Sequence, residues 1–266
     1  MSSRILALAT ALAALLQTPA RANETRDFCP DRPGLGTPPC TIDRGRGDAE
    51  IGLADWTLER SGGDRTDTWL LGDLLVRYGL TDTLEVQFGW TSFGAVRERV
   101  AGTVNRASGT GDATLALRRN LVHPDGSGFS AAFMPYASLP TGGRAIGAGD
   151  WSAGLLVPLS YELPHGLTLD FTGRIEAAAD ADRHGRHLAY GGIAGLDVSL
   201  PHDVTATVEL SAQRDEDPGG RSTQLVGGLS LAWMARPDWQ LDAGANAGLA
   251  GGAPDAELYV GIAHRF

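Results

Sequence analysis

The stretch that decides the fold is residues 255–266, with the sequence D-A-E-L-Y-V-G-I-A-H-R-F. Alternate positions from Ala256 to Phe266 are apolar except for His264, and most positions between them are polar or small. A period of two is typical of a β-strand with one apolar and one polar face. About 9–11 residues are enough for a tilted β-strand to cross a bilayer. The stretch therefore predicts a strand of an outer-membrane β-barrel.

Eleven strand-like segments precede it. They lie at 49–60, 67–79, 83–94, 112–122, 128–138, 150–162, 167–178, 187–200, 204–214, 221–235 and 239–250. The connections after even-numbered segments are short, and most of those after odd-numbered segments are longer, such as 95–111 and 139–149. Short turns at one rim and long loops at the other are typical of outer-membrane barrels. We therefore predict an all-β fold, a transmembrane up-and-down antiparallel β-barrel of about twelve strands formed by residues 49–266.

Aromatic residues on the predicted outer face gather at the two rims. If the strands run alternately up and down, the short-turn rim receives Tyr78, Phe129, Tyr161, Trp233, Trp239 and Phe266. The long-loop rim receives Trp90, Trp151 and Tyr190. Amphipathic rings favour the two interfaces of a bilayer, so two girdles support a membrane barrel. In the alternative, a soluble β-sandwich, this placement would be chance.

The first 22 residues have the features of a secretory signal. Arg4 precedes an apolar run over 5–16, and Ala20-Arg21-Ala22 has the form of a cleavage site. The run is too short for a membrane-spanning helix. The net charge is −10 for the full sequence and −12 once Arg4 and Arg21 leave with the signal. An acidic chain argues against a nucleic-acid partner, which requires a basic face.

Residues 23–48 form a segment rich in Pro, Gly and Arg, which favours neither a helix nor a central strand. It contains the only two cysteines, Cys29 and Cys40. In an exported protein such a pair predicts a disulfide, and two isolated cysteines are a poor metal site. We expect a stapled segment at or inside one mouth of the barrel; the alternative is a disordered leader.

Ionisable residues of a barrel must face the lumen, because Arg on the lipid side at mid-membrane costs about 2–4 kcal/mol. By alternation, the lumen-lining candidates are Asp73, Arg77, Glu85, Arg118, Glu162, Asp170, Arg174, Glu176, Asp197, Glu209, Asp242, Glu257 and Arg265. Nine carboxylates against four arginines predict a weak preference for cations. The set could seal the lumen as a polar network, line a narrow wet path, or do both.

The first segment departs from this face pattern. Ile51 and Leu53 are out of phase with Trp56 and Leu58. An extra residue in a strand shifts the alternation by one position, so we expect a β-bulge in this segment.

Few residues suggest chemistry. Residues 180–187 (D-A-D-R-H-G-R-H) place two Asp and two His at one mouth, where they could bind a metal or form an Asp/His pair. No ligand spacing is distinctive, so we interpret them as a solvated loop. His123, His165 and His202 lie in or beside short turns, and His264 faces lipid. We expect no catalytic residues, no metal site and no cofactor.

Several stretches resemble one large Gram-negative family, the outer-membrane transporters associated with the meta-pathway of phenol degradation. They are D-R-P-G-L-G-T-P-P-C (31–40), R-Y-G-L-T-D-T-L-E-V-Q-F-G-W (77–90), G-D-A-T-L-A-L-R-R-N-L (111–121), P-Y-A-S-L-P-T-G (135–142) and G-D-W-S-A-G-L-L-V-P-L-S-Y-E-L (149–163). The resemblance implies a porin-like role and supplies no catalytic residues. It also implies that Phe266 is an assembly signal, read by the barrel-assembly machinery during insertion.

We therefore expect a monomeric channel in the bacterial outer membrane, surrounded by lipid, for passive passage of small solutes that include aromatic or other hydrophobic compounds. Two alternatives stay open. One is an outer-membrane hydrolase with an active site at the rim, and the other is a structural barrel without a transport role.

Overall fold

The structure is a computed structural model and describes residues 25–266, so the predicted signal over 1–22 lies outside the described residues. Every regular element in 25–266 is a β-strand. No helix in this part of the chain is long and apolar enough to cross a bilayer. The strands are β1 (Gly47–Ser61), β2 (Asp64–Thr81), β3 (Leu84–Val100), β4 (Thr103–Gly109), β5 (Ala113–Val122), β6 (Phe129–Leu139), β7 (Ser152–Leu163), β8 (Leu167–Ala179), β9 (Arg186–Leu200), β10 (Val204–Asp215), β11 (Ser222–Arg236), β12 (Trp239–Ala250) and β13 (Ala256–Arg265).

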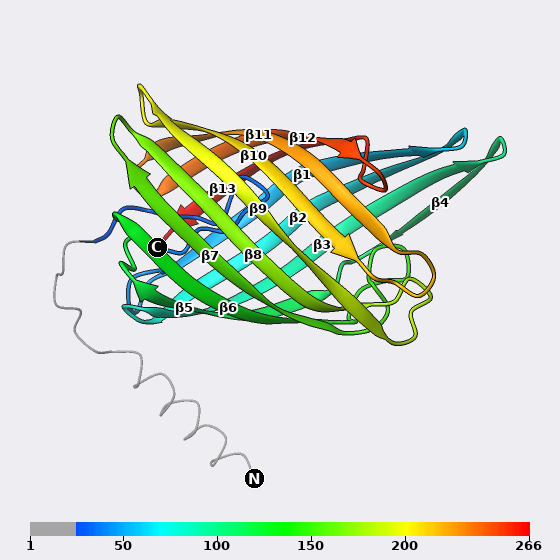
Figure 1. Cartoon of the computed structure of the whole chain (residues 1–266), viewed down its shortest axis with the longest axis horizontal. Helices are drawn as coiled ribbons and strands as arrows, with labels where there is room; N and C mark the ends of the chain where they lie inside the picture. The colour runs from blue at the N-terminus through cyan, green and yellow to red at the C-terminus, as the bar shows by residue number, and fades with distance from the viewer. Residues whose placement is uncertain (1–24) are drawn as a thin grey trace, which may run out of the picture.

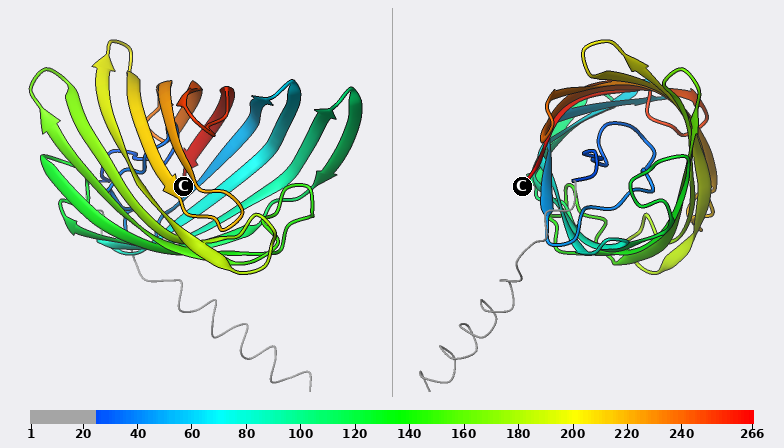
Figure 2. Two further views of the ribbon diagram at one scale, coloured as in Figure 1. Left: turned by 45° about the vertical axis from the view of Figure 1, so that its right-hand side comes forward. Right: turned by 90° about the vertical axis from the view of Figure 1, so that its left-hand side faces the viewer.

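Twelve of these strands close into one antiparallel barrel, which confirms the predicted fold class (Figure 1). Within the ring each strand pairs with the next one along the chain. β4 is outside the ring, so β3 pairs with β5, and β13 pairs with β1 to close it. At the seam, the Gly47 and Phe266 amides exchange backbone hydrogen bonds of 3.1 and 2.9 Å. Viewed from one end, the wall forms a closed ring (Figure 2). The closed ring leaves no wall strand with an unpaired edge in the bilayer.

The prediction of a loop over 95–111 was wrong. β3 continues to Val100, and β4 returns along it through a tight turn at Ala101 and Gly102. Both turn residues have positive φ, 47° and 84°, as the turns that match the twist of a hairpin require. β4 pairs only with the C-terminal half of β3, from Gly94 to Val100. This part of β3 and β4 therefore project beyond the wall at the long-loop end, beside the β1–β2 hairpin (Figure 1).

The barrel is apolar outside and polar inside, the reverse of a soluble protein. Val208 and Leu229 lie opposite each other on neighbouring strands, and each is 56% exposed. The largest fully buried side chains are those of Arg77, Arg118 and Glu50. At the short-turn rim Phe129 pairs with Tyr161, and both rings are exposed as a girdle requires.

The predicted bulge in the first strand is present, and neighbouring strands share it. The β1–β13 register shifts between Gly52 and Ala54. Below this level Gly52, Asp73 and Thr91 lie opposite one another on β1, β2 and β3. Above it, the corresponding row is Asp55, Leu70 and Gly94. On each of these three strands, the lumen-facing residues change from even to odd numbers, or from odd to even, at this level. An extra residue in each strand therefore exchanges the inner and outer faces of the sequence at the same height of the wall.

Candidate functional site

The N-terminal segment lies inside the barrel. Residues 26–43, hereafter the plug, occupy the lumen at the short-turn end (Figure 2). Their lower anchor is a backbone hydrogen bond of 3.0 Å from the Thr41 amide to the Pro124 carbonyl in the β5–β6 turn. Gly45 and Gly79 extend the attachment to β2 through a bond of 2.8 Å. The segment expected at or inside one mouth is therefore within the lumen.

The plug is closed by the predicted disulfide between Cys29 and Cys40, whose Cα atoms are 6.5 Å apart. The bridge brings the carbonyl oxygens of both cysteines toward Arg77. This guanidinium donates to Cys29 O at 2.8 Å and to Cys40 O at 3.5 Å. Arg118 donates to Cys40 O at 3.1 Å. The stapled end of the plug is thus bound by two arginines of the wall.

Carboxylates surround the same two arginines. Arg77 lies 2.9 Å from Glu85 and 3.1 Å from Asp31 of the plug, and Arg118 lies 2.6 Å from Asp31. Asp48 and Glu50 complete the group at 3.5 and 3.4 Å from Arg77. A buried charge is tolerated only when it is paired and hydrogen-bonded. Among the described residues, Asp48 and Glu50 form ion pairs with Arg77 alone, so removing Arg77 would leave both carboxylates unpaired.

Asp31 is the member of this group that the plug supplies. Burial alone would raise the pKa of its carboxyl group, but Arg118 and Arg77 outweigh burial and hold the pKa below its usual value. Asp31 is therefore ionised at neutral pH, as its ion pairs with the two arginines require.

Three wall carboxylates bind the plug through its backbone amides. Glu50 accepts hydrogen bonds of 2.8 Å from the amides of residues 31 and 32. Glu209 accepts two of 2.7 Å from residues 35 and 36, and Glu85 accepts one of 2.7 Å from residue 42. Hydrogen bonds to a charged acceptor are stronger than neutral ones, so these contacts fix the path of the plug.

The glycines of the D-R-P-G-L-G stretch permit these contacts. Gly34 has a φ of +116°, which side chains other than glycine rarely adopt. A Cβ atom at Gly36 would lie 3.0 Å from a carboxylate oxygen of Glu209. The backbone can approach Glu209 only where both positions lack a side chain.

Arg32 attaches the plug to the far side of the seam. Its guanidinium lies 3.0 Å from Asp242, and Gln240 donates to its carbonyl at 2.7 Å. A Cβ atom at Gly261 would overlap the same guanidinium, so the wall is hollowed there to receive it. Arg265 adds a bond of 2.6 Å to the Arg26 carbonyl.

The predicted lumen residues fall into two groups. Six bind the plug: Arg77, Glu85, Arg118, Glu209, Asp242 and Arg265. Six others lie on the same face by register but bind other wall groups or stand free of the plug: Asp73, Asp170, Arg174, Glu176, Asp197 and Glu257. Glu162 lies at the short-turn rim, where it accepts from the Gly128 amide at 2.8 Å.

Sequence reasoning missed Asp48 and Glu50, which are both fully buried. The predicted first strand began at residue 49, and the bulge interrupted the alternation that would have assigned its residues to the lumen or the lipid face. Below the bulge, Asp48, Glu50 and Gly52 share one parity with Ile51 on the other, and that short alternation was the available signal. Asp31 and Arg32 could not be assigned, because a segment without periodicity has no predictable face.

A cavity of about 420 Å³ lies above the plug, lined among others by Asp31, Gln87, Met134, Tyr136 and Arg174. Arg174 is paired with Glu176 on the same strand.

The loop between β6 and β7 narrows the lumen from the other end. Asp112 accepts hydrogen bonds of 2.7 Å from the amides of Gly142 and Ala148, which fix the loop at its base. Ile146 then reaches the lumen row of Leu70 and Gly94, where a Cβ atom on the glycine would lie 2.5 Å from it. The path through the barrel is thus restricted both by the plug and by this loop.

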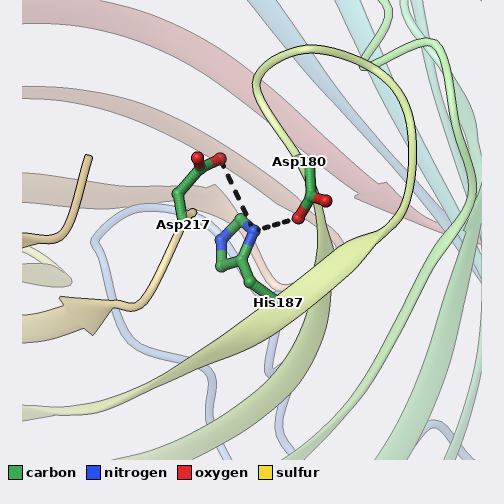
Figure 3. A group of neighbouring side chains, drawn as sticks. All are labelled: Asp180, His187 and Asp217. Carbon is green, nitrogen blue, oxygen red and sulfur yellow. Dashed lines mark hydrogen bonds and ion pairs between the residues drawn. The ribbon is translucent and has the colours of Figure 1, made fainter. Parts of the chain in front are cut away.

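At the long-loop mouth, Asp180 and His187 of the 180–187 loop form a cluster with Asp215 and Asp217, whereas Asp182 and His184 take no part in it (Figure 3). His187 Nδ1 lies 2.8 Å from Asp180 and 3.6 Å from Asp217, and Nε2 lies 2.8 Å from Asp215. The three residues Asp180, His187 and Asp217 have ligand atoms close enough to hold a metal ion. With carboxylates at both ring nitrogens, however, the geometry suits a protonated imidazole that joins two loops better than a ligand with a free lone pair.

The Asp217 carboxylate supports this interpretation. It accepts hydrogen bonds from the amides of Ala181 at 2.7 Å and Gly219 at 2.5 Å. Those bonds to Ala181 and Gly219 hold the pKa of Asp217 below its usual value. The cluster therefore clasps the β8–β9 and β10–β11 loops together.

Replacing Arg77 with Met should lower the free energy of unfolding by about 3–5 kcal/mol, because the change leaves Glu85, Asp48 and Glu50 buried without their main cation. Urea unfolding of the purified protein in detergent, followed by tryptophan fluorescence, measures this. The matched control is Arg119→Met, an exposed arginine bonded to Thr83, which should change stability by no more than about 0.5 kcal/mol. A loss of under about 1 kcal/mol for R77M would contradict the role assigned to the network.

The stabilisation provided by Asp31 should be independent of pH down to the ordinary range of an aspartate. Its pKa is lowered in the folded state, so its contribution is present above the unfolded value of 3.8 and is lost only as pH falls through the folded value. The measurement is the difference in unfolding free energy between the native protein and Asp31→Asn, taken from pH 7 to pH 3. A difference that shrinks between pH 7 and pH 5 would show that the arginines do not control this carboxyl group.

The fold is that of known outer-membrane channels. A crystal structure of an outer membrane channel from Pseudomonas putida F1 superposes with a TM-score of 0.74 at 18% identity, over 88% of this chain and 99% of that one. The NanC porin matches with a TM-score of 0.52 at 10% identity, over 82% of this chain and 98% of that one. The KdgM porin gives 0.50 at 12% identity, over 82% and 99%. No curated protein matches in sequence. Residues 30–266 match the family described as "Putative MetA-pathway of phenol degradation", and the chain belongs to this family of outer-membrane β-barrels.

Proposed function

We propose that the protein is a porin-like channel that lets small solutes cross the outer membrane passively, through a lumen narrowed by the plug and by the β6–β7 loop. The observation that carries this proposal is the 420 Å³ cavity between the two restrictions. A cavity of this size accommodates a small organic molecule. Family membership and the porin-like fold support the same function.

The lining of the cavity indicates the kind of solute. Ala116, Met134 and Leu156 present apolar groups to the cavity on β5, β6 and β7, whereas most lumen positions elsewhere are polar. Tyr136 and Arg174 supply polar groups beside them. A compact molecule with an apolar body and one polar group, such as a phenol-like aromatic compound, matches this mixture.

The charge of the lumen favours cations over anions. Arg77 and Arg118 form ion pairs with Glu85 and Asp31, and Arg174 is paired with Glu176, so carboxylates neutralise the charge of these three arginines. Asp170 on β8 and Asp197 on β9 lie close together on the lumen face, and among the described residues neither makes an ion pair. Unpaired carboxylates in a narrow pore attract cations, and the attraction weakens as salt screens it.

The functional test is conductance in planar bilayers, with and without the centre of the plug. In the test variant residues 30–39 are deleted, two glycines join the flanking positions, and both cysteines are changed by Cys29→Ser and Cys40→Ser. The 6.5 Å between the two Cα atoms is short enough for this linker, since an extended residue spans about 3.3–3.6 Å. The full chain should give small, cation-preferring currents, and the deletion should raise conductance several-fold.

The control is the Cys29→Ser, Cys40→Ser chain without the deletion, which separates loss of the disulfide from loss of the plug. If the deletion prevents folding, Arg32→Gln removes one attachment of the plug and should raise conductance less. Equal currents from all variants would contradict the assignment of the plug as the restriction. An absence of current in every variant, together with ester hydrolysis that His187→Ala abolishes, would favour the hydrolase instead.

We further propose that Phe266 is read by the barrel-assembly machinery and that the inserted barrel is a monomer. Phe266 is 62% exposed at the seam, while its backbone pairs with Gly47. Deleting Phe266 should therefore reduce the yield in the outer membrane several-fold, whereas Phe266→Tyr, which retains an aromatic ring, should not. Equal yields of the deletion and the native protein in outer-membrane fractions would refute the role of Phe266.

A further inference from the structure

Arginines gather on one outer surface of the molecule, on the parts of β1–β4 that project at the long-loop end. The register places Arg60 opposite Arg65, and Arg65 opposite Arg99. One row lower, Arg97 lies opposite Arg106. These five residues, hereafter the arginine face, form a continuous patch across four strands.

The arginine face points away from the lumen. Trp56 lies opposite Leu258 of β13, which is 51% exposed on the lipid side, whereas its neighbour Asp55 lies opposite Tyr259 on the lumen side. Above the bulge, Trp56 and Arg60 share one parity of β1 and so share the outer face. The cross-strand register extends this assignment to the arginines of β2, β3 and β4.

The positive charge of the face is not balanced by the protein. Asp67 lies 2.6 Å from Arg65 and 3.4 Å from Arg97, and Asp255 lies 3.6 Å from Arg60. Among the described residues, the other two arginines of the face make no ion pair. Five arginines and these two carboxylates leave an excess of three positive charges, or of two when Asp64 in the adjoining β1–β2 turn is counted. Like charges directly opposite on neighbouring strands destabilise a sheet, so an anion bound to this face would relieve the repulsion.

The aromatic residues below the arginine face indicate its height relative to the bilayer. Trp56 and Trp69 lie opposite each other on β1 and β2, one row below Asp67. Farther down, Leu71 and Phe93 are opposite each other and are exposed to lipid. Tryptophan marks the interface of a bilayer. The arginines begin one row above it, which is the level of lipid head groups.

A hollow of about 400 Å³ gives the face a concave part. It is lined by Arg60, Arg65 and Arg99 together with the β1–β2 turn. Gly62 and Gly63 of this turn have open space where a side chain would stand. The turn also brings Asp64, whose carboxylate accepts a hydrogen bond of 3.1 Å from the Ala101 amide. Three guanidinium groups around one hollow suit a tetrahedral oxyanion, because each can donate two parallel hydrogen bonds.

We propose that the arginine face binds the phosphate groups of lipid A, the phosphorylated anchor of lipopolysaccharide in the outer leaflet. The outer face continues directly from the lipid-exposed belt into the arginines, so a lipid whose chains pack against Leu71 and Phe93 can place its phosphates beside Arg65 and Arg99. A partner approaching from the solvent would not need this continuity. The proposal depends on the position in the outer membrane and not on which solute passes through the lumen.

The test is binding of purified lipopolysaccharide by the full-length mature protein in detergent, measured as retention of fluorescent lipopolysaccharide on the immobilised protein. The variant Arg60→Gln, Arg99→Gln, Arg106→Gln keeps the Asp67 pairs intact and should weaken binding at least tenfold. The matched control removes three arginines near the other rim, Arg46→Gln, Arg119→Gln and Arg236→Gln, and should retain native affinity. Conductance of both variants should equal that of the native protein, which verifies folding.

Two further arms identify the ligand group. Dephosphorylated lipid A should bind at least tenfold more weakly to the native protein, and inorganic phosphate should compete only at millimolar concentration. Equal affinity of the native protein and the first variant, or equal binding of dephosphorylated lipid, would overturn the proposal. Inorganic phosphate that competes as well as the lipid would overturn the assignment to a lipid. If the triple variant fails to fold, Arg99→Gln alone should still weaken binding several-fold, and no change there would also overturn it.

Discussion

The structure depends on the burial of two arginine side chains, Arg77 and Arg118, inside a polar lumen. A guanidinium remains charged in proteins, so its burial obliges the surroundings to supply acceptors. The wall provides Glu85 and its neighbours, and the plug provides Asp31 with two cysteine carbonyls. The alternation of the strands, the disulfide and the path of the plug all serve this requirement. In this molecule the interior is specified by hydrogen bonds and charge, and the apolar residues are directed to the lipid.

The local regularities of the fold could be predicted from sequence. A period of two, sorted loop lengths and aromatic girdles gave twelve wall strands, and two cysteines in an exported chain gave the disulfide. The β4 strand was missed because Ala101-Gly102 was not recognised as a turn within a longer loop. The plug contacts could not be predicted, because Arg32 meets Asp242 across 210 positions and no periodicity links them. Alternation indicates which wall residues face inward, but it does not indicate which of them meet the plug.

Charge divides the molecule into two electrostatic surfaces of opposite sign. The lumen is rich in carboxylates, and its arginines are largely engaged, whereas the outer surface of the projecting strands carries unbalanced arginines. A thin wall keeps these surfaces apart, since successive residues of a strand point to opposite sides. Solute selection and lipid contact can therefore vary independently, because a substitution on one face of a strand leaves the other face unchanged.

The aligned bulges on β1, β2 and β3 exchange the residue positions that face the lumen with those that face outward. Below them odd positions of β2 and β3 belong to the lumen, and above them odd positions such as 65, 97 and 99 belong to the outside. Homologues that lost one residue at each of the three bulges would exchange the two sets above them, turning the same arginines inward at the channel mouth. Three single-residue deletions, one at each bulge, could thus convert a lipid-facing surface into an anion-attracting vestibule. Alignments of such barrels should accordingly be judged by phase on each side of a bulge and not by residue identity alone.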